Sequence, residues 1–119
     1  MQRKLFTKSI ETQLRQNRTK QKPVQGTNSE IDFKPYVKLF NPCGAATWLL
    51  TELDDDGDTL FGLCDLGMGS PELGSVSLSE LSSVKGPLGL GIERDRWFTP
   101  DKTLSEYADE ARRSGRIVA

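Results

Sequence analysis

Four aspartates stand close together in the stretch TELDDDGDTLFGLCD, residues 51 to 65: Asp54, Asp55, Asp56 and Asp58. Carboxylates at this density can bind calcium, attract a basic partner, or form the solvated tip of a turn. In a calcium-binding EF-hand loop with Gly57 at the sixth position, Leu63 would stand where the loop needs a glutamate that supplies two oxygen ligands. The spacing therefore argues against calcium, and leaves a plain hairpin turn or an acidic surface for a protein partner.

Two further carboxylates, Asp65 and Glu72, flank the glycine-rich stretch GMGSP at residues 67 to 71. If they converge, they can hold Mg²⁺ or act as acid and base, so a small hydrolase-like or metal-dependent enzyme is a second hypothesis. The chain contains no histidine, which removes Ser-His-Asp and Cys-His catalysis and the commonest general base. We therefore favour a protein without catalytic activity, and assign no catalytic residue, metal ligand or cofactor.

The segment ERDRWF, residues 93 to 98, places two guanidinium groups beside an indole ring. In an extended chain Arg94 and Arg96 point to the same side, so with Trp97 they can grip a carboxylate or a phosphate. The alternative is that they pair with acidic residues of the last helix region: Asp101, Asp109 or Glu110. Together, the candidate partner-binding residues are Asp54, Asp55, Asp56, Asp58, Asp65, Glu72, Arg94, Arg96 and Trp97.

Charge is strongly separated along the chain although the net charge is only −1. Residues 1 to 22 carry seven lysines and arginines against one glutamate, and residues 52 to 80 carry eight carboxylates and no base. The acidic segment suits a basic protein partner, such as a nucleic-acid-binding defence complex. The basic start suits phosphate contacts, so a nucleic-acid-binding accessory protein is a third hypothesis, with a solvated helix face as the simpler interpretation.

The 119 residues and their 35% hydrophobic content predict one soluble domain with a modest core. We divide it into an N-terminal helix over 1–17, a flexible connection over 18–30 and a body over 31–119. No apolar run is long enough to cross a bilayer and none resembles a secretory signal, so we expect a cytoplasmic protein without a membrane partner. In that compartment Cys43 and Cys64 are expected to be small buried hydrophobic residues.

The apolar runs beside the aspartates predict two strands of a hairpin, residues 46 to 53 and 59 to 66. We take Asp56 and Gly57 as the central residues of a two-residue turn. That turn predicts the cross-strand pairs Asp55–Asp58, Leu53–Leu60, Leu50–Leu63 and Leu49–Cys64. Both faces of the hairpin are then apolar halfway along, which indicates strands in the middle of a sheet that is covered on both sides.

The remaining patterns predict further strands at 36–40 and 72–78, a loop at 85–91 and an extended piece at 92–98. Capping-box patterns open two helices, one at Ser77 and Glu80 and one at Thr103 and Glu106, the second ending at Gly115. The order indicates an α+β fold: a small antiparallel sheet of three to five strands with an N-terminal helix and C-terminal helices packed on it.

Two long stretches, KPYVKLFNPCGAATWLLTELDDDGDTLFGLCDLGMGSPELGSVSLSEL and GLGIERDRWFTPDKTLSEYADEARRSGRI, resemble an uncharacterised bacterial family. That family is a domain of unknown function carried on conjugative plasmids, integrative elements and phages, often near antirestriction genes. The resemblance includes the opening KLFTKSIETQL and so covers nearly the whole chain. It implies a mobile-element context and no established activity.

One departure from the family pattern concerns position 97. Members commonly read ERDLHF where this chain reads ERDRWF, so Trp97 stands where the resemblance implies a histidine. A histidine that served as a catalytic base in relatives would be lost here, which favours binding over catalysis. We therefore expect a non-enzymatic mobile-element protein that inhibits a host defence complex, of the anti-CRISPR or antirestriction type, through an acidic surface. Trp48 or Trp97 would anchor that contact if either is exposed.

Overall fold

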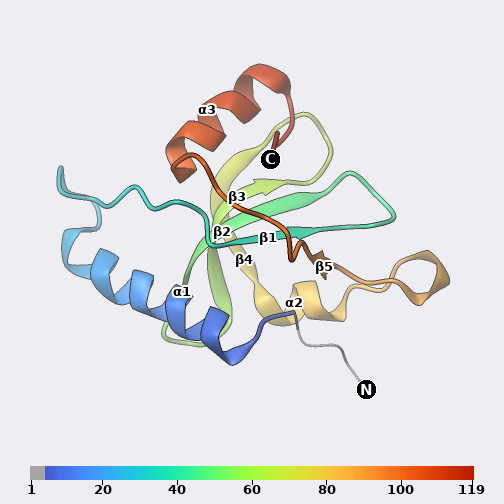
Figure 1. Cartoon of the computed structure of the whole chain (residues 1–119), viewed down its shortest axis with the longest axis horizontal. Coiled ribbons are helices and arrows are strands. Elements are labelled where there is room, and N and C mark those ends of the chain that lie inside the picture. The colour runs from blue at the N-terminus through green and yellow to red at the C-terminus, as the bar shows by residue number, and fades with distance from the viewer. Residues whose placement is uncertain (1–4) are drawn as a thin grey trace.

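The computed structural model describes residues 5 to 119, in which helices pack on a five-stranded sheet (Figure 1). In chain order the elements are α1 (Lys8–Gln21), η1 (Lys22–Val24), β1 (Val37–Phe40), β2 (Thr47–Leu53), β3 (Thr59–Asp65), β4 (Glu72–Ser77), α2 (Leu78–Ser83), η2 (Pro87–Gly89), β5 (Glu93–Arg94) and α3 (Leu104–Ser114). The strand order is β4-β3-β2-β1-β5, and all neighbours are antiparallel. The predicted α+β fold is confirmed.

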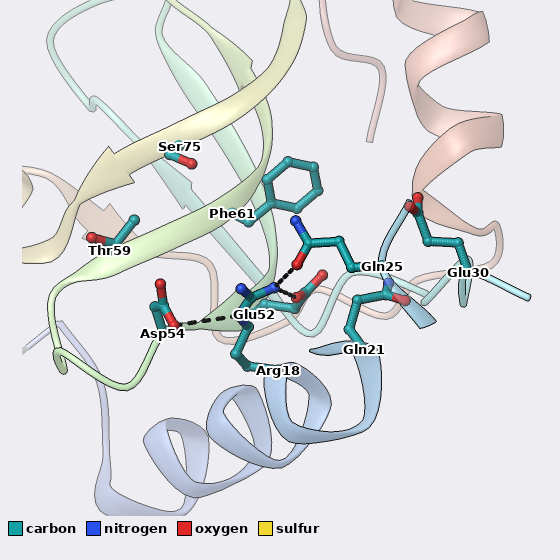
Figure 2. A pocket seen from close by; sticks show the side chains of 9 residues that line it. All are labelled: Arg18, Gln21, Gln25, Glu30, Glu52, Asp54, Thr59, Phe61 and Ser75. Atoms are coloured by element: carbon teal, nitrogen blue, oxygen red, sulfur yellow. Dashed lines mark hydrogen bonds and ion pairs between the residues drawn. The ribbon is translucent and has the colours of Figure 1, made fainter. Parts of the chain in front are cut away.

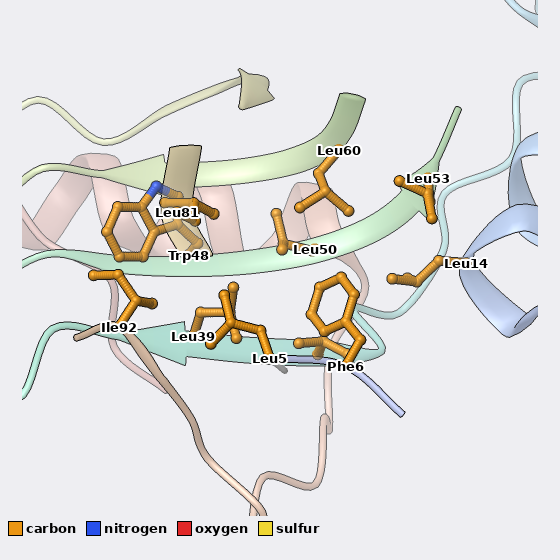
Figure 3. Packing of buried hydrophobic residues seen from close by; sticks show 11 residues of the cluster. Leu5, Phe6, Leu14, Leu39, Trp48, Leu50, Leu53, Leu60, Leu81 and Ile92 are labelled. Atoms are coloured by element: carbon orange, nitrogen blue, oxygen red, sulfur yellow. The ribbon is translucent and has the colours of Figure 1, made fainter. Parts of the chain in front are cut away.

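One face of the sheet, which we call the α1 face, carries Leu50, Leu53 and Leu60. Leu14 of α1 and Leu81 of α2 pack against these strand residues, as Figure 3 shows together with their neighbours. Burial of one such leucine is worth roughly 1.5–3 kcal/mol. This layer therefore supplies much of the free energy that holds both helices to the sheet.

The opposite face, which we call the α3 face, carries Leu49 and Leu63. The apolar side of α3, formed by Leu104, Tyr107, Ala108 and Ala111, packs on this pair. The helix begins after Thr103, whose backbone N–H donates to Glu106 at 2.9 Å, and ends at Gly115 with φ 74°. Its predicted bounds are confirmed, because its cap and its stop are local signals.

The first helix is shifted along the chain from the predicted range 1–17: residues 1 to 4 lie outside the described residues, residues 5 to 7 precede the helix, and α1 continues past Asn17. The amide of Asn17 donates to the carbonyl oxygen of Thr51 at 2.9 Å, so this side chain joins α1 to β2 and the helix continues to Gln21. Gln21 in turn donates to the carbonyl of Ile31 at 2.8 Å and accepts from its N–H at 2.9 Å. The segment expected to be a flexible connection over 18–30 thus begins inside α1 and is fastened at its far end.

The register of the central hairpin corrects two of the predicted pairs. Leu53 faces Leu60 as expected, but an extra residue at Thr51 shifts the following pairs, so that Leu50 faces Gly62 and Leu49 faces Leu63. This β-bulge forces the backbones together. A Cβ atom on Gly62 would lie 2.0 Å from the carbonyl oxygen of Leu49, so the position requires glycine.

The hairpin turn also differs from the predicted two-residue form. The N–H of Gly57 donates to the carbonyl of Asp54 at 3.0 Å, so Asp55 and Asp56 are the central residues and Gly57 follows with φ 71°. Thr59 then pairs with Asp54 through a backbone hydrogen bond of 2.8 Å. The carboxylate of Asp56 stabilises this longer loop by accepting the backbone N–H groups of Asp58 and Thr59, both at 2.8 Å.

No helix among residues 5 to 119 is long and apolar enough to span a bilayer. The cysteine prediction is wrong for one of the two residues: Cys43 is exposed, in the turn before β2, whereas Cys64 is half-buried in β3. Cys43 lies in a turn whose shape is set by Asn41, which accepts the N–H of Cys43 at 2.9 Å. Turn geometry thus overrides the tendency of cysteine toward burial.

Candidate functional site

The basic first helix lies against the acidic hairpin, so the charges that are separated in sequence meet in the fold. Arg18 of α1 contacts Asp54 through Nε at 3.3 Å and Glu52 through Nη1 at 3.5 Å. Lys22, directly after the helix, pairs with Asp55. Much of the acidic charge is therefore compensated within the molecule, and the hairpin tip is not a free negative surface.

The other two hairpin aspartates hold backbone and hydroxyl groups. Asp56 accepts from the hydroxyl of Thr59 at 2.6 Å and from the N–H groups of Thr59 and Asp58, and these bonds lower the pKa of Asp56 to about 2. Asp58 accepts from the hydroxyl of Ser77 at 2.7 Å and from the N–H of Ser79, so its pKa is also lowered. Both carboxylates shape the turn and the start of α2, although Asp56 remains exposed.

Asp65 and Glu72 do not converge. Glu72 is the cross-strand partner of Cys64, so these two side chains lie on the same face of the sheet. Asp65 follows Cys64 in the strand and therefore projects from the opposite face. Asp65 is buried, accepting from the N–H of Gly67 at 2.8 Å and of Ile117 at 2.9 Å. Its carboxylate thus ties the segment after α3 to the end of β3, while Glu72 is exposed on the edge strand.

Trp97 is the most exposed large aromatic side chain among residues 5 to 119, at 92%, whereas Trp48 is buried at 5%. Trp97 lies in a turn in which Asp95 accepts its N–H at 2.9 Å. Arg94 donates to the carbonyl of Leu5 at 2.7 Å and so joins β5 to the segment before α1.

The acidic residues near the last helix pair with bases other than Arg94 and Arg96. The ion pairs there join Lys102 to Asp101 and Glu110, and Arg112 to Asp109. Arg96 is exposed next to Trp97. The surface of this segment therefore presents one arginine and one indole ring, rather than the two guanidinium groups that the sequence suggested.

A row of three residues on the α3 face lies beyond the part that α3 covers. Glu52 faces Phe61 across the hairpin, and Phe61 faces Ser75 across the next pair of strands. The three side chains therefore project from the same side of the sheet, one strand apart. Because the bulge at Thr51 precedes this row, Glu52 shares the face of Leu49 and Leu63 instead of facing away from them.

A cavity of about 190 Å³ lies over this row, between the sheet, the end of α1 and the loop after it (Figure 2). Its polar lining is unusually rich in carboxylates and amides. The lining residues are Arg18, Gln21, Gln25, Glu30, Glu52, Asp54, Thr59, Phe61 and Ser75. Figure 2 shows the guanidinium of Arg18 at the centre, joined to Asp54, Glu52 and Gln25, whose amide oxygen accepts from Nη1 at 2.7 Å.

Glu52 forms the floor of this cavity and is only 5% exposed. Burial raises the pKa of Glu52 above its ordinary value, and the nearby charge of Arg18 opposes that effect. The 3.5 Å separation from Arg18 is longer than a good hydrogen bond. The amide of Gln21 also interacts with this carboxylate. A buried carboxylate whose ion pair is long is stabilised little by that pair, and such groups often mark a functional site.

A second cavity of about 310 Å³ adjoins the first and shares four of its lining residues: Gln21, Glu30, Glu52 and Phe61. Apolar side chains add to its lining, among them Leu73, 41% exposed, and Ile31, 38% exposed. We call the two cavities together the Glu52 groove. One end of the groove is acidic and the other is largely apolar.

The sequence alone did not single out Glu52, although it belongs to the acidic segment. The available signal was a carboxylate inside the apolar run ATWLLTEL, where a charged residue needs a partner or a function. The bulge that turns Glu52 toward the α3 face has no clear local sequence pattern. Its partner Arg18 lies far away in the chain, so only the fold could reveal this contact.

Comparison with known proteins places the chain in a family but supplies no activity. A family model described as "Protein of unknown function (DUF2958)" matches residues 5–118, so the chain belongs to this family. Neither the curated proteins nor the solved structures that were searched give a match.

Proposed function

We propose that this member of the DUF2958 family is a non-enzymatic protein of a mobile genetic element that binds and inhibits a host defence complex. The complex would be a CRISPR effector or a restriction enzyme, and the contacts would be between proteins. The mobile-element context rests on the family resemblance described above. Because such complexes act on DNA inside the cell, the cytoplasm is the place where this function would be exercised.

The observation that carries the proposal is the Glu52 groove. Three carboxylates, those of Glu30, Glu52 and Asp54, line its acidic end around the single guanidinium of Arg18. At the hairpin tip Lys22 offsets the charge of Asp55, so the negative surface is confined to the groove and the exposed Asp56. A negative surface of this kind is complementary to the positive channel in which a defence nuclease holds its nucleic acid, and long-range attraction would speed their association.

Trp97 supplies a second element of the proposed contact. Aromatic side chains and arginine are enriched among the residues that dominate binding energy at protein interfaces. Trp97 and Arg96 are both exposed on a turn whose backbone Asp95 holds in place, so little backbone entropy would be lost when they bind.

Direct binding of nucleic acid by the basic first helix receives less support from the geometry. Arg18 and Lys22 are engaged with carboxylates of the hairpin, so a phosphate group would have to compete with those ion pairs. An enzyme built on Asp65 and Glu72 is likewise not favoured, since the two carboxylates project from opposite faces. Neither alternative has a specific observation in its favour.

The test is inhibition of DNA cleavage by a panel of purified CRISPR effectors and restriction enzymes. The wild-type chain should inhibit at least one member at micromolar concentration or below, with weaker binding at higher salt. The combined replacement of Asp54, Asp55, Asp56 and Asp58 by Asn, and separately Trp97→Ala, should weaken inhibition. Glu80→Gln, at an exposed residue outside the proposed contact, serves as the matched control for loss of a carboxylate.

Two outcomes would reject the proposal. One is that no enzyme of the panel is bound or inhibited. The other is that inhibition is unchanged by both the aspartate replacements and Trp97→Ala in variants whose circular dichroism and thermal unfolding match the wild type, because then neither surface contributes.

A further inference from the structure

We propose that the Glu52 groove binds an extended basic segment of a partner protein, with an arginine or lysine side chain at the acidic end and an apolar side chain on Phe61 and Leu73. This inference rests on the proposed function for the existence of a protein partner, and it names the chemistry of that partner. It does not depend on which defence complex is bound.

The charge of the lining determines the sign of the ligand. Glu30, Glu52 and Asp54 bring three carboxylates to the acidic end, and Arg18 is the single base among the residues that line it. An anionic ligand would meet a surplus of negative charge, whereas a cation would offset it. A cation would also offset the charge of the buried Glu52 carboxylate, whose contact with Arg18 is long.

The groove already holds one guanidinium, which shows that its acceptors suit this group. Arg18 reaches Asp54, Gln25 and Glu52 from α1, at 3.3, 2.7 and 3.5 Å. Asp54 and Glu52 each have a second carboxylate oxygen, and Figure 2 shows Asp54, Glu52 and Gln25 arranged around the Arg18 guanidinium. The ring of Phe61 lines the same space and can attract a cation through its face.

The size of the two cavities favours side chains over a whole small-molecule ligand. Pockets for drug-sized ligands span roughly 300–1,000 Å³. The acidic cavity, at about 190 Å³, lies below this range, and the apolar cavity, at about 310 Å³, lies at its lower end. Two adjoining small cavities of different character are what two side chains of one segment require.

The edge of the sheet makes room for such a segment. β4 lies at the end of the strand order and, among residues 5 to 119, pairs with β3 alone, so these residues leave its outer side open along Ser75 and Leu73. In an extended chain every second side chain points the same way, about 7 Å apart. The pattern that fits is therefore a basic residue followed two positions later by an apolar one.

The experiment is a titration of the full chain with short peptides, followed by NMR and calorimetry. The probe is acetyl-Gly-Arg-Gly-Leu-Gly-amide. One matched peptide replaces Arg with citrulline, which keeps the shape and removes the charge, and another replaces Leu with Ser. We expect the Arg-Leu probe to shift the amide signals of Phe61 and Ser75. Each matched peptide should bind more weakly, and the citrulline peptide by about tenfold or more.

Two variants of the chain complete the test. Glu52→Gln keeps the size of the side chain and should weaken binding of the probe by about tenfold, whereas Glu80→Gln, at an exposed residue outside the groove, should leave it unchanged. Ser75→Leu places bulk at the exposed edge of the groove and should also weaken binding. It provides a second test should Glu52→Gln disturb the fold.

The inference is overturned if the citrulline peptide binds as well as the arginine peptide, or if no probe binds at millimolar concentration. It is also overturned if Glu52→Gln and Glu80→Gln have equal effects, because the attraction would then come from the overall negative charge and not from the groove. Peptide binding without inhibition of any defence enzyme would uphold the groove and reject the proposed function. Inhibition that survives both Glu52→Gln and Ser75→Leu would uphold the proposed function and reject the groove as the binding site.

Discussion

Arg18 and Glu52, which lie 34 positions apart in the sequence, form an ion pair of 3.5 Å where α1 meets β2. The Arg18 side chain is 21% exposed and that of Glu52 is 6% exposed, so water screens this pair little. Lys22 and Asp55 form a second contact between the same two regions, but their side chains are 43% and 70% exposed. We therefore expect loss of the Arg18–Glu52 pair to destabilise the protein more than loss of the Lys22–Asp55 pair.

Arg18→Ala should lower the free energy of unfolding by about 1–3 kcal/mol, because it leaves the buried Glu52 carboxylate without its cation. Lys22→Ala should change it by no more than about 0.5 kcal/mol, as expected for an exposed pair. Urea unfolding followed by circular dichroism measures both values. Equal losses for the two variants would show that the Glu52 carboxylate does not depend on Arg18.

Gly62→Ala should be among the most destabilising single changes in the sheet. The added methyl group would lie 2.0 Å from the carbonyl oxygen of Leu49, so the bulged strand must shift, at a cost of about 3 kcal/mol or more. Gly74→Ala is the matched control, because Gly74 faces Gly62 across β3 and β4 and has open space at its Cβ position. Thermal unfolding should separate the two variants clearly, and a stable Gly62→Ala protein would disprove the bulge.

The raised pKa of Glu52 predicts a particular dependence of stability on pH. The folded state holds the Glu52 proton more tightly than the unfolded chain, whose pKa is near 4.5. Its contribution to stability is therefore fully present below pH 4.5 and is lost as the pH rises through the higher folded pKa. Glu52→Gln should gain stability relative to the wild type across that range. A constant difference between pH 4 and pH 8 would contradict the raised pKa.

Asp56 should behave in the opposite way. Its pKa is lowered to about 2, first of all by the hydroxyl of Thr59 and then by the backbone N–H groups of Thr59 and Asp58. Its contribution to stability is thus present above pH 3.8 and is lost as the pH falls through about 2. Thr59→Val removes the hydroxyl and should raise the pKa of Asp56. NMR titration of the side-chain carboxyl carbons measures this, and a wild-type midpoint near 3.8 would rule it out.

The two cysteines should react at very different rates with a thiol reagent. Cys43 is exposed, whereas burial raises the pKa of Cys64 to about 11, so its reactive thiolate is rare at neutral pH. The folded protein should therefore show one fast and one slow reaction with Ellman's reagent. Cys43→Ser should leave only the slow one, and two fast reactions in the wild type would place Cys64 at the surface.

Local signals in the sequence were sufficient for most of the elements. Thr103, Glu106 and Gly115 bound α3 correctly, because capping depends on residues within one helical turn. Apolar runs that are apolar on both faces halfway along indicated β2 and β3 and their position inside the sheet, which the strand order confirms. The end of the first helix was predicted at residue 17, which is too early, because Asn17 is buried against Thr51 of a distant strand and α1 continues to Gln21.

The candidate site, in contrast, was decided by tertiary structure. The order of residues determined the charge of each segment, and composition determined the absence of histidine. Neither determined that the basic helix would lie on the acidic hairpin. The bulge at Thr51 turned Glu52 toward Phe61, and packing buried Trp48 while leaving Trp97 exposed. Local preferences act over a few residues, whereas register, burial and ion pairing depend on which distant segments the folded core brings together.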